Sequence, residues 1–435
     1  MFVAENGEPD SSEQCCDVNV AMNTLTIVIP AFNEEAAIGA TIERCLAARA
    51  GICEAANLDD VELIVVSDGS TDRTAEIAQS FDGVEVIVFP KNRGYGAAIK
   101  EGFARGTSEF VGFLDADGTC DPRFFATLCR NAQSSNADVV LGSRLGSDSK
   151  MPTIRRIGNR FYAAILGVLC GEMVTDTASG MRVLRRSALA DLYPLPDGLH
   201  FTPAMSARAL LSGMKIVELP MHYEERVGQS KLSVFRDGFR FLRAIVEGVL
   251  WYRPERLFLL AFAACFLVSL LMFAYPIEFY LREHRLEEWM IYRFIACSLL
   301  GSFGFVLLAA GTLAHRFVLS TNDRRAGPRF WPCAFELLFV GKTLVLFVAV
   351  ILLVSLMLVW PGLIEYVRTR HVTLHWSRVM LAAFGCLVAF IALVTGTLLQ
   401  VFRIRGRDRR PLEEAQFEPR LGDRRRLDSV TTSTE

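Results

Sequence analysis

The chain has 435 residues, of which 51% are hydrophobic, and its formal net charge at pH 7 is -2. This length suffices for an α/β domain and a second region, and the near-neutral charge excludes a protein that binds polyanions through overall positive charge. The eleven cysteines lack the paired spacing of a zinc site, so a reduced, cytosolic compartment is expected.

The first 23 residues are polar and show no periodicity, which predicts a disordered tail. They include Glu5, Glu8 and Asp10 and no long apolar run, so no secretory signal peptide is expected. The domain that follows should therefore stay on the side of the membrane on which it is made.

Short apolar runs alternate with helical segments over residues 24–231. Strands are expected at residues 25–29, 61–66, 84–89, 110–114 and 139–141, and helices at residues 34–48, 71–80 and 95–105. Apolar strands that alternate with helices are typical of parallel βαβ units, so the expected class is a Rossmann-like α/β domain. Ligands of such sheets bind beyond the carboxyl ends of the strands.

Residues 232–254 combine an apolar stripe with a charged stripe. Phe239, Ile245 and Val249 recur at helical spacing, and Arg240 and Arg243 lie on the other side. This pattern predicts an amphipathic helix on a membrane surface. The alternative is a helix that packs on the soluble domain.

Four long apolar runs follow, at residues 257–275, 294–314, 337–360 and 379–402. Each is close to the roughly 20 residues that cross a bilayer, which predicts an all-α transmembrane domain of four helices over residues 255–402. Arginines are concentrated at the ends that an even number of spans brings to one side, so both ends are expected in the cytoplasm. Residues 403–435 are expected to form a basic, disordered cytosolic tail.

Two carboxylates, Asp115 and Asp117, follow the apolar run at residues 110–114. Carboxylates separated by one residue at the end of a strand can share a hard cation, and Mg²⁺ bound in this way keeps positions open for substrate phosphates. Such a cation neutralises the charge that develops on a diphosphate leaving group.

Other polar clusters also follow predicted strands. Asp68 stands at one strand tip, where a carboxylate can bind a base or a ribose, and residues 92–96 form a glycine-containing loop before a helix. Arginines, which suit bidentate contacts to phosphate, gather in two places. The first group is Arg144, Arg155, Arg156 and Arg160, and the second is Arg182 and Arg226 with Lys231.

Together these segments resemble family 2 glycosyltransferases of the GT-A fold, and most closely the dolichyl- or polyprenyl-phosphate mannosyl- and glucosyltransferases with a C-terminal membrane domain. The segments that carry the resemblance are residues 28–34, 67–72, 92–98, 115–117, 142–144, 179–182 and 228–231. Two positions depart from the family pattern, with Ser67 in place of a first aspartate and Thr119 in place of a glutamine.

The resemblance implies roles for individual residues. The nucleotide-sugar would be bound by Pro30, Phe32, Glu34, Asp68, Ala116, Arg226 and Lys231. A Mg²⁺ or Mn²⁺ site would include Asp115, Asp117 and Thr119, and the acceptor phosphate would contact Arg144, Arg156, Asn159 and Arg160. Asp117, Asp115 and Arg144 would form the catalytic group.

The expected function is inverting transfer of a hexose from a UDP- or GDP-sugar, of the GDP-mannose or UDP-glucose type, to a polyprenyl phosphate. A phosphate acceptor is anionic at neutral pH and needs no general base, whereas a hydroxyl acceptor would need one, for which Asp176 is a candidate. The alternatives are a glycosyltransferase that acts on a lipid or glycan hydroxyl and a non-catalytic membrane scaffold with a degenerate domain.

The expected partners are the nucleotide-sugar, the polyprenyl phosphate and the membrane, without nucleic acid. The expected location is a membrane with the catalytic domain in the cytosol, which is the plasma membrane in a bacterium and the endoplasmic reticulum in a eukaryote.

Overall fold

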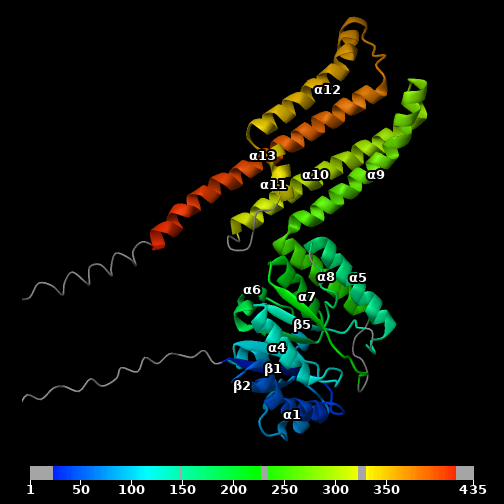
Figure 1. Cartoon of the computed structure of the whole chain (residues 1–435). Helices are drawn as coiled ribbons and strands as arrows, with labels where there is room; N and C mark the ends of the chain where they lie inside the picture. The colour runs from blue at the N-terminus through cyan, green and yellow to red at the C-terminus, as the bar shows by residue number, and fades with distance from the viewer. Residues whose placement is uncertain (1–22, 147–148, 172, 227–233, 322–329, 418–435) are drawn as a thin grey trace, which may run out of the picture. The chain divides into compact units, whose positions relative to one another are not determined.

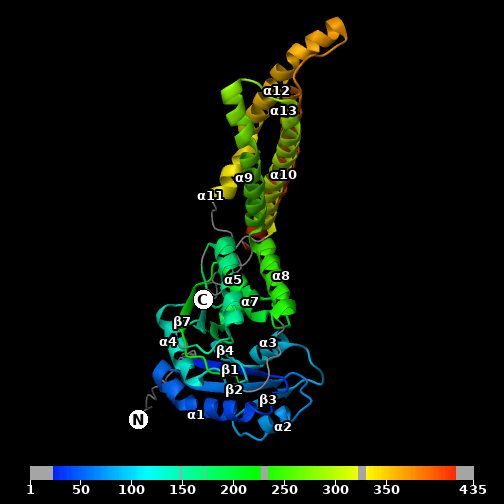
Figure 2. The same cartoon turned by 90° about the vertical axis from the view of Figure 1, so that its right-hand side faces the viewer.

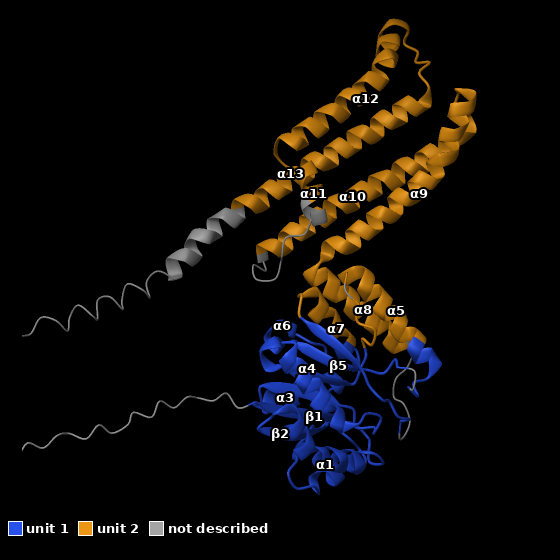
Figure 3. Cartoon of the chain, viewed as in Figure 1, with its two compact units in different colours: residues 1–156, 178–202, 215–232 blue, residues 157–177, 203–214, 233–435 orange. Residues whose placement is uncertain are grey.

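The computed structural model describes residues 23–146, 149–171, 173–226, 234–321 and 330–417 (Figure 1). The chain divides into two compact units (Figure 3). Unit 1 comprises residues 1–156, 178–202 and 215–232, and unit 2 comprises residues 157–177, 203–214 and 233–435. Unit 2 therefore contains two segments from the region in which the sequence predicted the nucleotide-sugar domain. The predicted N-terminal tail lies almost wholly outside the described residues.

Unit 1 is built on a seven-stranded sheet in the order β3-β2-β1-β4-β6-β5-β7 (Figure 2). The strands are β1 Thr24–Ala31, β2 Asp60–Ser67, β3 Glu85–Val88, β4 Phe110–Leu114, β5 Val139–Ser143, β6 Met181–Arg185 and β7 Ile216–Pro220. The first five correspond to the five expected strands, and β6 and β7 are additional.

The five expected strands run in the same direction, as the sequence predicted, and the additional strand β6 makes the sheet mixed. Strand β1 pairs in parallel with β2 and β4, and β5 pairs in parallel with β7, but β6 runs antiparallel to both β4 and β5. The pairing of Leu114 with Met181 places the start of β6 beside the end of β4. This arrangement brings the segment before β6 next to the Asp115–Asp117 loop.

Helices cover both faces of the sheet. The helices of unit 1 are α1 Ile38–Ala56, α2 Thr74–Gln79, α3 Tyr95–Arg105, η1 Pro122–Phe124, α4 Phe125–Ser134, η2 Arg186–Ala188 and α6 Leu189–Leu192. Helices α5 Thr153–Cys170 and α7 Phe201–Leu211 lie mostly in unit 2. Leu25 and Ile27 are buried in a core with residues of α1 and α4. Val28 faces the opposite side, where it lies against Gly102 of α3 so closely that a Cβ there would overlap it. Alternate residues of one strand thus pack under helices on both faces.

Unit 2 holds the C-terminal helices, α8 Val234–Tyr252, α9 Pro254–Glu283, η3 Glu288–Met290, α10 Ile291–Thr321, α11 Phe330–Leu338, α12 Gly341–Thr369 and α13 Trp376–Phe417. Four of them, α9, α10, α12 and α13, contain apolar segments long enough to cross a membrane, as the sequence predicted. Helix α10 packs against α9 and α13, and α13 packs against α12 (Figure 1).

Two boundaries differ from the prediction. The third span begins at Gly341 instead of residue 337, because Leu337 and Leu338 belong to the short helix α11. Helix α13 continues to Phe417, so residues 403–417 are helical and do not form the unstructured tail expected there. A helix can continue past its apolar segment because its backbone hydrogen bonds do not depend on side-chain polarity.

Helix α8 uses part of its apolar stripe inside unit 2. Ile245 and Val249 are fully buried, and Gly248 lies against Leu211 and Ala207 of α7. This face of α8 therefore packs on protein, which was the alternative to a helix that lies on a membrane surface. Phe239 and Trp251 are exposed, so the placement of α8 on a membrane surface stays a prediction carried by the other face.

Candidate active site

The Asp115–Asp117 loop leaves the end of β4 and is held by helix α1. Thr41 Oγ1 donates to the carbonyl oxygen of Ala116 at 3.1 Å. Arg44 donates to the carbonyl oxygens of Gly118 and Cys120 at 3.1 and 2.9 Å. These contacts fix the backbone on which the two carboxylates stand, and Ala116 is therefore a buried part of the loop framework.

Asp115 is enclosed by residues from two other segments. Tyr95 at the start of α3 donates its hydroxyl proton to Asp115 Oδ1 at 2.7 Å. Gly180, just before β6, lies so close that a Cβ at this position would overlap the carboxylate. The antiparallel β6 therefore positions a glycine where no other residue fits without displacing Asp115.

The two carboxylates of the loop are close enough to interact. Burial and, next, the negative charge of Asp117 raise the pKa of Asp115 to about 7, against the hydrogen bond from Tyr95 and the positive charges of Arg144 and Arg226. A bound cation would relieve this repulsion, because opposite charge stabilises both carboxylates. The pair thus has the electrostatics of a cation site.

Asp117 is oriented from both sides. Its Oδ1 accepts hydrogen bonds from the hydroxyl of Thr119 at 2.7 Å and from the Thr119 backbone N–H at 3.2 Å. Its Oδ2 lies 3.6 Å from Nη1 of Arg226. Nη2 of the same arginine donates to Glu34 Oε1 at 2.6 Å. The structure therefore brings together Glu34, Asp117 and Arg226, which lie far apart in the sequence.

The donor set fits Mg²⁺ or Mn²⁺ with an incomplete protein shell. Within the residues that the structure describes, no three histidine, cysteine, aspartate or glutamate side chains gather to hold a metal. Asp115 and Asp117 would hold the ion, and the remaining positions would be left for substrate phosphates and water, as Mg²⁺ commonly requires. Thr119 supports this set by orienting Asp117.

The loop after β1 is tied to the loop after β2. Asn33 adopts a left-handed backbone conformation with φ of 51°, and its side-chain oxygen accepts from the Thr71 N–H at 2.8 Å. The Glu34 N–H donates to Thr74 Oγ1 at 2.8 Å. Pro30 is buried at the end of β1, while Phe32 and Glu34 are partly exposed beyond it.

Asp68 has a different environment from the one expected for an open nucleotide contact. It is 3% exposed, and its two oxygens accept from the backbone N–H groups of Arg93 and Gly94 at 2.6 and 2.9 Å. Burial raises the pKa of Asp68 above its ordinary value despite these bonds. Asp68 thus anchors the glycine loop before α3, and a direct contact to the nucleotide stays a prediction.

Two arginines border the carboxylates. The guanidinium of Arg144 lies 5.6 Å from the centre of the Tyr223 ring, and its charge opposes the rise in the pKa of Asp115. Arg182 is completely buried in β6, and its Nε donates to the Ser179 carbonyl oxygen at 3.1 Å. The sequence placed Arg182 in a basic cluster but gave it no role. Burial raises the pKa of Tyr95 well above its ordinary value, and the positive charge of Arg182 opposes this rise.

The predicted acceptor residues are divided between the units. Arg156 belongs to unit 1, where Nη2 donates to the Ser149 carbonyl oxygen at 3.1 Å. Asn159 and Arg160 belong to unit 2. Arg160 is exposed, and its contact to an acceptor stays a prediction, as does that of Arg156.

Asn159 is buried, and its amide is engaged by protein. It donates to Asp176 Oδ1 at 2.8 Å and accepts from Thr177 Oγ1 at 3.0 Å. The Asn159 amide is therefore not exposed, and its predicted contact to the acceptor phosphate has no support from this burial. Asp176 is fully buried in this network, which disfavours it as a general base for a hydroxyl acceptor. Lys231 lies outside the described residues.

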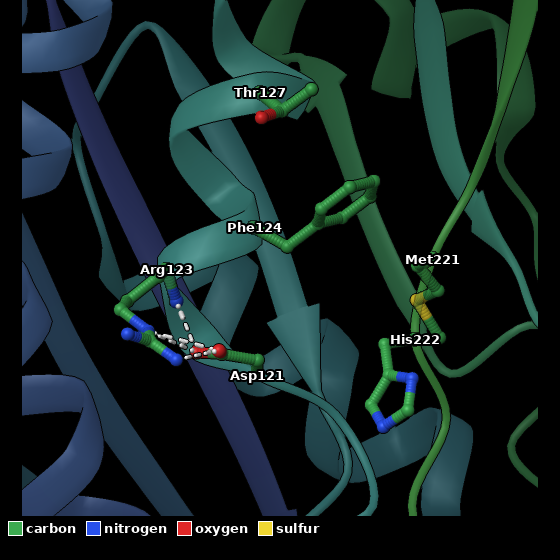
Figure 4. Close-up of a pocket in the computed structure, with 6 residues that line it drawn as sticks. All are labelled: Asp121, Arg123, Phe124, Thr127, Met221 and His222. Carbon is green, nitrogen blue, oxygen red and sulfur yellow. Dashed lines mark hydrogen bonds and ion pairs between the residues drawn. The ribbon is translucent and has the colours of Figure 1, made fainter.

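A pocket beside the carboxylate loop contains none of the predicted site residues (Figure 4). It is lined by Asp121, Arg123, Phe124, Thr127, Met221 and His222. Asp121 and Arg123 form an ion pair at 2.6 Å across its wall. Asp115 and Asp117 do not line this pocket, so it is not the place where we expect the transfer reaction.

Comparison with known proteins identifies the family. The family described as Glycosyl transferase family 2 matches residues 26–193. The dolichyl-phosphate hexose transferase of Haloferax volcanii is 32% identical over 227 residues, which cover 51% of this chain and 92% of that protein. The low-salt glycan biosynthesis hexosyltransferase Agl6 of the same organism is 34% identical over 227 residues. That alignment covers 51% of this chain and 52% of Agl6, so the chain spans about half of that relative.

A solved structure, that of glucosyl-3-phosphoglycerate synthase from Mycobacterium tuberculosis, matches with 21% identity and a TM-score of 0.43. The match covers 52% of this chain and 79% of that one. The family match and the high coverage of the dolichyl-phosphate hexose transferase, together with the mixed sheet and its carboxylate loop, show that this chain belongs to glycosyl transferase family 2.

Proposed function

We propose that this membrane glycosyltransferase moves a hexose from a UDP- or GDP-sugar to the phosphate of a polyprenyl phosphate, with inversion at the anomeric carbon. One observation carries the proposal: Arg226 contacts both Glu34 and Asp117, next to Asp115. The same chain has four apolar helices long enough to cross a membrane. The relative named as a dolichyl-phosphate hexose transferase uses the same class of acceptor, according to its name.

The residues of the site would act by positioning and by charge. Glu34 and Arg226 would hold the nucleotide-sugar beside the carboxylate loop. Asp115 and Asp117 would hold Mg²⁺ or Mn²⁺, which supplies positive charge to the diphosphate leaving group when bound. Arg144 would contact the acceptor phosphate next to the same carboxylates.

The transfer itself would need no general base. An acceptor phosphate oxygen would form a bond to the anomeric carbon while the bond from that carbon to the diphosphate oxygen breaks, and the nucleoside diphosphate would leave. Catalysis would then rest on orientation and on charge stabilisation.

We also propose that unit 1 faces the cytosol. Arg253, Arg256, Arg316 and Arg403 lie at one end of the four spans, where the sequence also has arginines at 324, 325, 329, 405, 407, 409 and 410. The opposite loops carry fewer, among them Arg282, Arg285, Arg368 and Arg370, and the side with more arginines is the cytoplasmic one in membrane proteins.

The proposal is tested with purified full-length protein, polyprenyl phosphate, Mn²⁺ or Mg²⁺, and a panel of radiolabelled UDP- and GDP-hexoses. Label from one donor should enter a lipid that releases its sugar in mild acid, and Asp117→Ala should abolish this transfer. If label instead enters hydroxyl-bearing lipids, the phosphate acceptor is wrong. If no donor is used under any of these conditions, the hexosyl transfer itself is wrong.

A further inference from the structure

Unit 2 contains a buried carboxylate at the end of the bundle where α9 begins. Glu336 of α11 has a side chain that is 6% exposed. Arg316 of α10 donates to both of its oxygens, at 2.7 Å from Nε and 2.5 Å from Nη2. Arg403 of α13 donates to Glu336 Oε1 at 2.9 Å. One carboxylate thus joins three helices.

The charges of this cluster do not balance. Burial alone would raise the pKa of Glu336, but the hydrogen bonds from Arg316 and Arg403 bring it below its ordinary value, so the carboxylate is ionised. Among the side chains that the structure describes, two guanidinium groups beside one carboxylate leave one positive charge in excess. An excess positive charge at the end of membrane-spanning helices attracts an anionic group of the adjoining lipid surface.

Both arginine side chains are partly exposed, and exposed apolar residues are their neighbours in the sequence. The side chains of Arg316 and Arg403 are 31% and 44% exposed. Each of the three charged residues is followed in sequence by a large exposed apolar one, namely Phe317, Leu337 and Ile404. A ligand of this surface would therefore combine an anionic group with a hydrocarbon chain.

We propose that Arg316 and Arg403 bind the phosphate group of a lipid, with Glu336 holding the two guanidinium groups in place. The exposed apolar residues contact the lipid chain. Guanidinium groups suit this role because their planar donors match phosphate oxygens. A phosphate-bearing lipid can be a phospholipid of the bilayer or a polyprenyl phosphate, and the site recognises the feature that both share.

The test measures lipid binding to the full-length protein in detergent by native mass spectrometry, without nucleotide-sugar, so that the result does not depend on transfer. The probes are phosphatidylglycerol, a polyprenyl phosphate, and zwitterionic phosphatidylcholine as the reference. Arg403→Gln and Arg316→Gln should weaken binding of the two anionic lipids about tenfold, the loss expected for a charge-assisted hydrogen bond. Arg378→Gln is the matched control, because Arg378 is exposed on α13 at the opposite end of the helix.

Glu336→Gln separates a lipid site from a helix clamp. It removes the negative charge that competes with the lipid phosphate, and the amide oxygen of glutamine can still accept a hydrogen bond from a guanidinium group, so anionic lipids should bind at least as tightly as to the native protein. Equal binding by the native protein and both arginine variants would overturn the proposal. So would a loss in Glu336→Gln as large as in Arg403→Gln, because the cluster would then act through packing alone. A larger loss for polyprenyl phosphate than for phosphatidylglycerol would identify the site as one for the acceptor, and an equal loss as one for membrane phospholipid.

Discussion

Arg226 Nη2 lies 2.6 Å from Glu34 Oε1, although the two residues are 192 positions apart in the sequence. Nη1 of the same guanidinium lies 3.6 Å from Asp117 Oδ2. The side chains of Arg226 and Glu34 are only 23% and 12% exposed, so water screens the pair weakly. One arginine thus links the loop after β1 to the carboxylate loop after β4.

Arg226→Gln should therefore leave Glu34 and Asp117 as neighbouring carboxylates without a shared cation. Without the guanidinium, the charge that orients both carboxylates toward the nucleotide-sugar is lost, and we expect roughly a hundredfold loss in kcat/KM, which is about 3 kcal/mol of transition-state stabilisation. Steady-state transfer kinetics would measure this loss. Arg123→Gln is the control, because Arg123 is 82% exposed and pairs only with Asp121 among the ion pairs described, and it should change activity less than about twofold.

Combining Arg226→Gln with Glu34→Gln should cost less than the sum of the two single losses, because the residues act through one contact. Additive losses would show that the two side chains work independently, contrary to the bridge that the structure describes.

Tyr95 should act as a positioning residue for Asp115. Tyr95→Phe keeps the ring and removes only the hydroxyl that donates to Asp115 Oδ1. We expect about a tenfold fall in kcat and weaker Mn²⁺ binding, with little change in melting temperature. Electron paramagnetic resonance would measure the Mn²⁺ binding. Tyr193→Phe is the comparison, because Tyr193 lies near Arg186 at the other end of β4. Unchanged Mn²⁺ binding in Tyr95→Phe would contradict the positioning role.

Gly180→Ala should disturb the carboxylate pair, because a Cβ there overlaps the Asp115 side chain. Displacement of Asp115 by even about 1 Å is expected to cost on the order of a hundredfold in activity. Gly146→Ala provides the control, since a Cβ at Gly146 meets no atom within 4 Å. Full activity in Gly180→Ala, with a normal melting temperature, would mean that Asp115 does not need its observed position.

Removal of divalent metal should stop transfer, because the carboxylate pair then lacks the charge that offsets its repulsion. EDTA should abolish activity in the native protein, and added Mn²⁺ or Mg²⁺ should restore it. Asp117→Asn should bind Mn²⁺ weakly and should not recover. Full activity in EDTA would argue against the metal site.

The sequence predicts the site where strand ends determine it. Asp115, Asp117 and the segment with Glu34 follow apolar strands, so parallel topology places them at one edge of the sheet. The roles of Tyr95 and Gly180 escaped prediction because both depend on contacts across segments. Gly180 reaches Asp115 only because β6 is antiparallel, and β6 carries Arg182 and Arg185 in a five-residue strand, which obscures the apolar pattern.

Burial was the other feature that the sequence could not reveal. Asn159 was expected at an acceptor phosphate, but its amide lies in a buried network with Asp176 and Thr177. Likewise Ile245 and Val249 of α8 have the spacing of a membrane-facing stripe, and both are buried in unit 2. An apolar stripe has the same spacing whether lipid or protein covers it.

The central claim is that the acceptor is a lipid phosphate, and the most direct measurement compares two acceptors that differ only in that group. Purified full-length protein would receive the same labelled nucleotide-sugar with either a polyprenyl phosphate or the polyprenol of equal chain length. The account predicts transfer to the phosphate, none to the alcohol, and loss of transfer in Asp117→Ala. Comparable transfer to the alcohol would contradict it, because the site would then have to activate a hydroxyl.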